Sequence, residues 1–136
     1  TVATLKYLKK GGRLTPAVAA IGTMLRLKPV LTIQGDKLDS YSKARTMNQA
    51  KKTMIEAIRK DIETRFGGVE SHQVYLDIAH TNNEEEAMKF RDEVEAAFPG
   101  YKVGIVAPLS LSVSCHIGDG ALALAATRKL DDTEIK

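Results

Sequence analysis

The sequence predicts an α/β fold in which a mixed, largely parallel sheet is layered with helices, together with one β-hairpin. Strand-like segments alternate with helix-like segments at lengths typical of βα units, which favours parallel strands joined by helices. A Gly-Asp-Lys turn at 35–37 separates two strand-like segments and indicates the hairpin. The length of 136 residues is close to the commonest size of a domain, so we expect residues 1–136 to form one domain.

Two helices are expected before the first strand. Residues 5–10 look like the end of a helix, which the glycine pair at 11–12 closes. Thr15 followed by Pro16 is typical of a helix start, because threonine caps the first turn and proline suits the first helical position. The small and apolar residues at 17–27 then indicate a helix that packs closely on a sheet or lines a cavity.

A hairpin and a long amphipathic helix follow. β-branched residues predict a strand at 29–34, and 38–44 is expected to return as its partner. Thr46 is the candidate cap of a helix that ends at the glycine pair 67–68. Apolar residues recur along this helix at helical spacing and form one face: Met47, Ala50, Met54, Ile58 and Ile62.

The second half of the chain repeats the alternation of strand and helix. Alternating apolar residues predict a strand at 72–79, and Asn83 with Glu86 three residues later indicates a helix start with a capping box. Another strand is expected at 102–107, and a last helix at 117–128. The helix after Asn83 has its own apolar face, formed by Ala87, Phe90, Val94 and Ala97.

Composition and charge exclude several classes of protein. With 43% hydrophobic and 27% charged residues the chain has the composition of an ordinary globular domain, and no window of about 18 apolar residues could span a membrane. The net charge of +3, without tryptophan or a dense basic stripe, argues against nucleic-acid binding. The single cysteine, Cys115, precludes an internal disulfide and favours a reducing, cytoplasmic location; we expect no secretory leader.

The most informative motif is a glycine turn, Gly118-Asp119-Gly120, which follows His116. We expect an extended segment to lead through His116 into this turn, and the expected helix after it to offer unpaired N–H groups and the positive end of its dipole. An imidazole beside such a turn can hold a carboxylate or a phosphate. The turn also falls where ligands bind in open α/β sheets, at the carboxyl ends of strands. The alternative is a turn that only connects two elements.

Catalytic and metal chemistry find little support in the sequence. In an extended segment Cys115 and His116 face opposite sides, and although Ser114 and His116 share a side, no carboxylate is placed to orient the imidazole. His72 and His80 are expected to be exposed residues at the ends of a strand, and no histidine or cysteine pair has zinc-ligand spacing. We therefore expect no catalytic residue, no metal site and no cofactor.

Basic residues gather between the expected hairpin and the long helix. Such a run is usually a solvated face, and the functional alternative is a surface that docks an acidic partner or a phosphate. The run consists of Lys37, Lys43, Arg45, Lys51 and Lys52.

These motifs, taken in their order, resemble the DegV family. The resemblance is carried by the segments 7–14 (YLKKGGRL), 27–33 (LKPVLTI), 43–46 (KART) and 116–122 (HIGDGAL), with the apolar helix between the first two. It runs over nearly the whole chain and is to the second, C-terminal domain of such proteins; the preceding domain is absent from this sequence. The sequence departs from the family pattern at Asp119, where proline is frequent between the glycines.

The resemblance implies a function. DegV proteins are two-domain α/β proteins that bind a long-chain fatty acid, and several are the binding subunit of bacterial fatty acid kinase, which presents the acyl carboxylate to a separate ATP-binding subunit. It follows from the resemblance that this domain is not itself an enzyme. Its partners would be a long-chain fatty acid, the ATP-binding kinase subunit and its own N-terminal domain.

The resemblance also implies positions for the site. His116, Arg13, Gly118 and Gly120 would lie at the carboxylate or phosphate end of the ligand, and Arg45, with Lys43, would contact the kinase subunit. The acyl chain would be lined by small or apolar residues: Ala17, Ala20, Ile21, Met24, Leu25 and Leu122.

Two rival functions stay open on the sequence. The DegV fold is similar to that of the dihydroxyacetone kinase substrate domain, in which a histidine holds a small carbonyl substrate covalently, a part that His116 could play. The chain could also be a structural or regulatory module without a ligand, which predicts a closed core around 17–25. The mass of a bound ligand would separate these possibilities.

Overall fold

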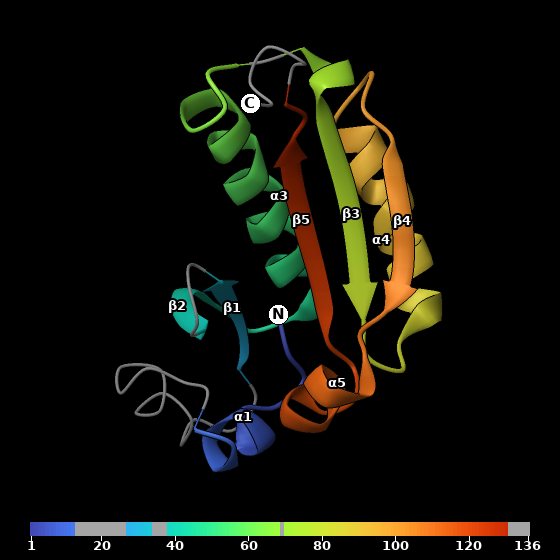
Figure 1. Ribbon diagram of the computed structural model, residues 1–136. Coiled ribbons are helices and arrows are strands. Elements are labelled where there is room, and N and C mark those ends of the chain that lie inside the picture. The colour runs from blue at the N-terminus through green and yellow to red at the C-terminus, as the bar shows by residue number, and fades with distance from the viewer. Residues whose placement is uncertain (13–26, 34–37, 69, 131–136) are drawn as a thin grey trace.

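The computed structural model describes residues 1–12, 27–33, 38–68 and 70–130, and within these ranges its elements follow the expected order as far as residue 108 (Figure 1). The helix expected at 17–27 lies, apart from residue 27, outside the described residues. The elements are α1 (Lys6–Lys10), β1 (Lys28–Ile33), β2 (Leu38–Ala44), α3 (Met47–Thr64), a 3₁₀ turn (Ser71–Gln73), β3 (Val74–His80), α4 (Glu84–Ala97), β4 (Val103–Pro108), α5 (Leu111–Ile117) and β5 (Leu122–Arg128).

The strands form two sheets of different kind. β3 is the centre of a three-stranded sheet with the order β4-β3-β5, in which it pairs parallel with β4 and antiparallel with β5. β1 and β2 form a separate antiparallel hairpin. The mixed α/β architecture with an additional hairpin is therefore confirmed, with the parallel part provided by β3 and β4.

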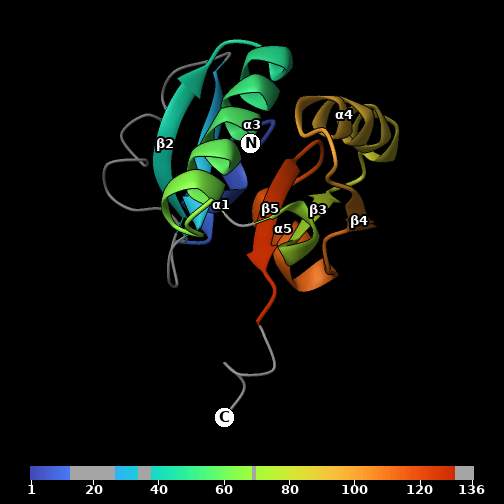
Figure 2. The same ribbon diagram turned by 90° about the horizontal axis from the view of Figure 1, so that it is seen from above.

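The main core lies between the three-stranded sheet and the two long helices, α3 and α4, which cover one face of the sheet (Figures 1 and 2). The alternation predicted for β3 is confirmed, since Val74, Leu76 and Ile78 are buried. The apolar faces predicted for α3 and α4 supply the other side of the core, with Phe90 and Val94 fully buried. Burial of this apolar area is the dominant force that holds the two helices on the sheet.

A smaller hydrophobic cluster stands beside the main core and supports α1. Its buried members are Val2, Leu5, Leu8 and Ala121, against which Leu31, Leu38 and Ile117 pack. The cluster therefore joins α1, the hairpin, α5 and the residue that precedes β5. In Figure 1 α1 and α5 lie together at one end of the three-stranded sheet, apart from α3 and α4.

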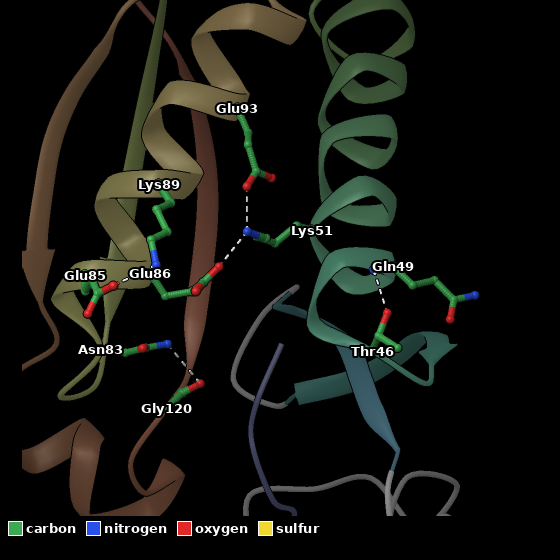
Figure 3. Close-up of polar contacts among 9 residues, drawn as sticks. All are labelled: Thr46, Gln49, Lys51, Asn83, Glu85, Glu86, Lys89, Glu93 and Gly120. Carbon is green, nitrogen blue, oxygen red and sulfur yellow. Dashed lines mark hydrogen bonds and ion pairs between the residues drawn. The ribbon is translucent and has the colours of Figure 1, made fainter.

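The start of α3 confirms the predicted cap. The Thr46 hydroxyl oxygen accepts a hydrogen bond from the Gln49 amide at 3.1 Å, which satisfies one of the unpaired donors of the first turn. The start of α4 differs from the prediction, because Asn83 occupies the cap position without a capping bond from its side chain and the capping box is absent. Its side-chain nitrogen donates instead to the Gly120 carbonyl at 3.4 Å, while Glu86 turns to Lys51 (Figure 3).

The position of Lys51 differs from the expectation that the basic residues form a solvated face. Its side chain is 3% exposed and reaches from α3 to α4, where its ammonium lies 2.6 Å from a carboxylate oxygen of Glu86 and 2.6 Å from one of Glu93 (Figure 3). Burial lowers the pKa of the ammonium, but the hydrogen bonds and charges of the two glutamates outweigh it, so the pKa is raised above its ordinary value. The charge is kept in the core because it is paired.

The end of the chain departs most from the prediction. The segment expected to be extended before His116 is the helix α5, and the segment expected to be a helix at 117–128 is, from Leu122 onward, the strand β5. β5 pairs with β3 over its seven residues, from Leu122 opposite His80 to Arg128 opposite Val74. The order of helix and turn is thus reversed: the glycine turn follows a helix and leads into a strand.

Candidate functional site

The glycine turn and His116 lie at the carboxyl end of the parallel strand pair, as the sequence predicts. His80, the last residue of β3, is opposite Pro108 of β4 and Leu122 of β5, and the His80 carbonyl accepts a hydrogen bond from Leu109 at 2.8 Å. α5 begins two residues later and carries His116 in its last turn. Figure 1 shows α5 at the end of the sheet toward which the arrows of β3 and β4 point.

α1 packs against α5 and the glycine turn at this end of the sheet. A Cβ atom placed on Gly11 would lie 2.8 Å from His116 Nδ1, so the backbone after α1 forms one wall of the imidazole site. The Tyr7 ring covers Gly118, where a Cβ atom would meet ring carbons at 2.5 Å and 2.8 Å. Gly118 also has a φ of 78°, a left-handed conformation that favours glycine. Glycine is therefore required at Gly118 on two independent grounds.

The amides of Gly118, Gly120 and Ala121 are already used within the fold. Gly118 donates to the Ser114 carbonyl at 2.8 Å, Gly120 donates to the Thr81 carbonyl at 2.8 Å, and Ala121 donates to the Thr81 hydroxyl oxygen at 2.9 Å. The strand β5, and not a helix, follows the turn, so the expected helix N-terminus with its free donors is wrong. The turn allows a close approach of the backbone to α1, and the imidazole of His116 lies two residues before it, in the last turn of α5.

The helical conformation around His116 also changes the relation between neighbouring side chains. Ser114 and His116 are two positions apart on a helix and so do not face the same side, contrary to the expectation for an extended segment. The Ser114 hydroxyl donates to the Leu109 carbonyl at 3.0 Å, and the exposed Cys115 thiol contacts the Ser112 carbonyl at 3.3 Å. Neither side chain is hydrogen-bonded to His116, and no nucleophile–base pair is formed here.

Two residues of the loop after β3 contribute to this end of the molecule: Thr81, which is not among the residues predicted from the sequence, and Asn83, which is predicted only as a helix cap. Thr81 is 3% exposed and hydrogen-bonds to three residues at 118–121, and Asn83 bonds to Gly120. A polar residue directly after a buried strand is the sequence signal that could have indicated Thr81. His80 is 6% exposed, not exposed as expected, and its Nδ1 accepts a hydrogen bond from the Asn83 amide at 3.2 Å.

The other residues assigned from the resemblance are placed as follows. Lys43 and Arg45 are exposed at the end of β2, and the Arg45 amide donates to the Gln49 side chain at 2.9 Å. Leu122 is 1% exposed and belongs to the main core. The remaining predicted site residues lie outside the described residues: Arg13, Ala17, Ala20, Ile21, Met24 and Leu25.

A separate hollow of about 310 Å³ is lined by residues near the carboxyl ends of α3 and α4, among them Arg59, Ile62, Phe98 and Tyr101. Arg59 is the basic group there, and its guanidinium donates to the Ala97 carbonyl at 2.7 Å and stacks over the Phe98 ring at 4.7 Å. These contacts tie the end of α3 to the end of α4, which gives Arg59 a structural role.

Within the described part of the chain, no group of three or more histidine, cysteine, aspartate or glutamate side chains is arranged to hold a metal ion. None of the helices in the same ranges is both long and apolar enough to cross a membrane.

Comparison with known proteins gives the family. The family model described as "Uncharacterised protein, DegV family" matches residues 1–129. A DegV domain-containing protein of Clostridium acetobutylicum is 32% identical over 123 residues, which cover 89% of this chain and 40% of that protein. The chain belongs to the DegV family.

Solved structures of the family share the fold. A DegV family protein from Thermus thermophilus, described by its fatty acid binding, has a TM-score of 0.79 at 29% identity, over 93% of this chain and 43% of that one. DegV from Bacillus subtilis, described as a fatty acid binding protein, has a TM-score of 0.73 at 30% identity, over 94% of this chain and 43% of that one. The chain thus spans 40–43% of the length of these relatives.

Proposed function

We propose that this chain is a long-chain fatty-acid-binding domain whose carboxylate end is formed where α5, the glycine turn and the end of α1 meet. The observation that carries the proposal is His116, which lies at the carboxyl ends of β3 and β4 with its Nδ1 against Gly11 and its backbone followed by the turn. The relatives from Thermus thermophilus and Bacillus subtilis that share the fold are described as fatty acid binding. We propose further that residues 1–136 correspond to the second domain of a two-domain protein.

The chemistry of this end suits a carboxylate. An imidazole N–H that donates to an ionised carboxylate forms a charge-assisted hydrogen bond, which is about twice as strong as a neutral one. Arg13, two residues after Gly11 in the sequence, is the proposed second donor. Gly118 and Gly120 contribute shape, because their own amides are bonded within the fold. A fatty acid tail gains about 0.8 kcal/mol per buried CH₂, and the proposed lining is the apolar set around Ala17–Leu25.

His116→Ala and Gly11→Ala test the carboxylate end in the full-length protein that carries this chain. His116→Ala removes the donor and is expected to raise the Kd for palmitate by tenfold or more, since a hydrogen bond to a charged group is worth about 1.5–3 kcal/mol. Gly11→Ala keeps the imidazole but introduces a methyl group 2.8 Å from its Nδ1, so we expect weaker binding without loss of the side chain. His72→Ala, at an exposed position, is the matched control.

Mass spectrometry of organic extracts from the purified protein identifies the ligand class. A fatty acid in the extract supports the proposal, whereas a small carbonyl adduct on His116 would favour the alternative of a dihydroxyacetone-kinase-like substrate domain. Palmitate affinity that stays at the wild-type value in both His116→Ala and Gly11→Ala would contradict the proposed carboxylate end.

We also propose that the bound carboxylate is presented to a separate ATP-binding kinase subunit, with Arg45 and Lys43 at the contact. Both side chains are exposed at the end of β2 and are free to meet an acidic surface. Arg45→Glu is expected to leave palmitate binding unchanged and to lower acyl-phosphate formation when the kinase subunit and ATP are added. Wild-type formation of acyl phosphate by this variant would remove Arg45 from the proposal.

A further inference from the structure

We infer that Thr81 is the positioning residue of the carboxylate end: it fixes the glycine turn and, through the turn, the place of His116. This role rests on the proposed function, because it concerns the same site. Thr81 does not contact the ligand in this assignment. It acts on the backbone that carries the imidazole.

Four hydrogen bonds connect Thr81 to the turn and to the residue after it. The Thr81 amide donates to the Ala121 carbonyl at 3.2 Å, and its carbonyl accepts from Gly120 at 2.8 Å. Its hydroxyl oxygen accepts a hydrogen bond from the Ala121 amide at 2.9 Å, and its O–H group donates one to the Gly118 carbonyl at 2.5 Å. One residue that is 3% exposed therefore holds both sides of the turn.

The Thr81 hydroxyl makes two hydrogen bonds that no apolar side chain can make. A hydroxyl group offers one donor and two acceptor lone pairs, so it can bond to the Gly118 carbonyl and the Ala121 amide at once. Valine has the same shape but neither function, and it would leave both backbone groups without their partner. Because a buried polar group that loses its partner is costly, we expect the turn to change conformation rather than keep its present form.

His80 and Thr81 form hydrogen bonds with residues on both sides of α5. The carbonyl of His80, directly before Thr81, accepts from Leu109 ahead of α5, and Thr81 holds Gly118 directly after it. Asn83 adds a bond to Gly120 at 3.4 Å (Figure 3). His116 is two residues from Gly118, so a shift of the turn moves the last turn of α5. A displacement of about 1 Å in a binding geometry is enough to weaken it strongly.

The test compares Thr81→Val with Thr81→Ser, which restores the hydroxyl, in the full-length protein. Thr81→Val is expected to raise the Kd for palmitate about tenfold, while Thr81→Ser returns it to within about threefold of the wild-type value. Hydrogen exchange of the Ala121 amide is the second readout, since Thr81→Val removes its acceptor and exchange should become faster. Thr53→Val is the control, because its hydroxyl bonds at 3.0 Å to Gln49 on the exposed surface of α3.

The outcomes separate this inference from the proposed function. Wild-type palmitate affinity in Thr81→Val, with affinity lost in His116→Ala, would overturn the role of Thr81 and leave the proposed function standing. Wild-type affinity in both His116→Ala and Gly11→Ala, with faster Ala121 exchange in Thr81→Val, would contradict the proposed carboxylate end and, with it, the role of Thr81 in ligand binding, although Thr81 would still be shown to stabilise the turn. If Thr81→Val does not fold, Thr81→Ala takes its place, and equal palmitate affinity of the alanine and serine variants would overturn the inference.

Discussion

Lys51 places a positive charge between α3 and α4, and the two glutamates that neutralise it come from later in the chain. Glu86 and Glu93 are 35 and 42 residues away in sequence. A charge pattern along one helix therefore cannot predict this cluster, because local sequence shows only that Lys51 lies among other basic residues. Its burial follows from the packing of the two helices, because a buried ammonium is stable only where it is paired.

The double variant Glu86→Gln, Glu93→Gln is expected to lower the free energy of unfolding by about 2 kcal/mol, because the Lys51 ammonium stays buried but loses the two negative charges that compensate it. The loss is not larger because both glutamates are partly exposed and their charges are partly screened by solvent. Lys51→Met should cost less, since it removes the buried charge and keeps much of the packing. The free energy of unfolding in urea measures both. Glu85→Gln, which removes an exposed pair with Lys89, is the control. Equal losses in the control and the double variant would contradict this account.

The raised pKa of Lys51 also predicts a pH dependence. A group whose pKa is higher in the folded state contributes stability that is fully present below its unfolded value of 10.5 and is lost as the pH rises through the folded value. We therefore expect the stability difference between wild type and Lys51→Met to shrink above pH 10.5. A difference that stays constant or grows through that range would show that the ion pairs do not stabilise the fold.

At the scale of elements, local signals correctly predict α3 and the hairpin, whereas the last part of the chain differs from the prediction because it pairs with a distant strand. Thr46 and the apolar spacing after it define α3, and the hairpin follows from its two strand-like segments. The segment 122–128 is rich in alanine and leucine, which favours a helix locally. It forms β5 because β3 offers a complete antiparallel partner, and such tertiary pairing overrides a weak intrinsic preference.

In the candidate site, too, some features could be predicted from the sequence and others could not. The position of His116 and the glycine turn at the carboxyl ends of β3 and β4 could be predicted, because it follows from the order of the elements along the chain. The use of the Gly118 and Gly120 amides by Ser114 and Thr81 could not, because it depends on a helix before the turn and a loop 37 residues earlier. Sequence patterns can identify side chains with functional groups, but they rarely show which backbone amides are left without a hydrogen-bond partner in the fold.

The cap of α3 gives a prediction at this scale. Thr46→Ala removes the acceptor of the Gln49 amide and is expected to lower the free energy of unfolding by about 1 kcal/mol. Thr53→Ala lies in the same helix, where its hydroxyl bonds back to a carbonyl, and should change stability by less than about 0.5 kcal/mol. Thermal unfolding of both variants checks the difference. A loss in Thr53→Ala as large as in Thr46→Ala would mean that the helix start is held by packing and not by its cap.

On the scale of the whole molecule, the proposed carboxylate end is built on the smaller of two hydrophobic clusters. Leu8 and Ala121 belong to this cluster together with the residues around α1, whereas β3, α3 and α4 share the main core. Because the two clusters are separate, we expect the end that carries His116 to open locally while the sheet and its two long helices stay folded. Stability is expected to differ between the two parts, because each is held by its own buried area.

Leu8→Ala and Phe90→Ala test whether the two clusters are energetically separate. Both side chains are fully or almost fully buried, at 1% and 0% exposure, and such truncations cost about 2–5 kcal/mol. Leu8→Ala should accelerate hydrogen exchange in α1 and at Gly118, Gly120 and Ala121, while the amides of β3 keep their protection. Phe90→Ala should accelerate exchange throughout. Loss of protection in β3 equal to that in α1 after Leu8→Ala would mean that the clusters unfold as one unit, and that the carboxylate end has no local freedom of its own.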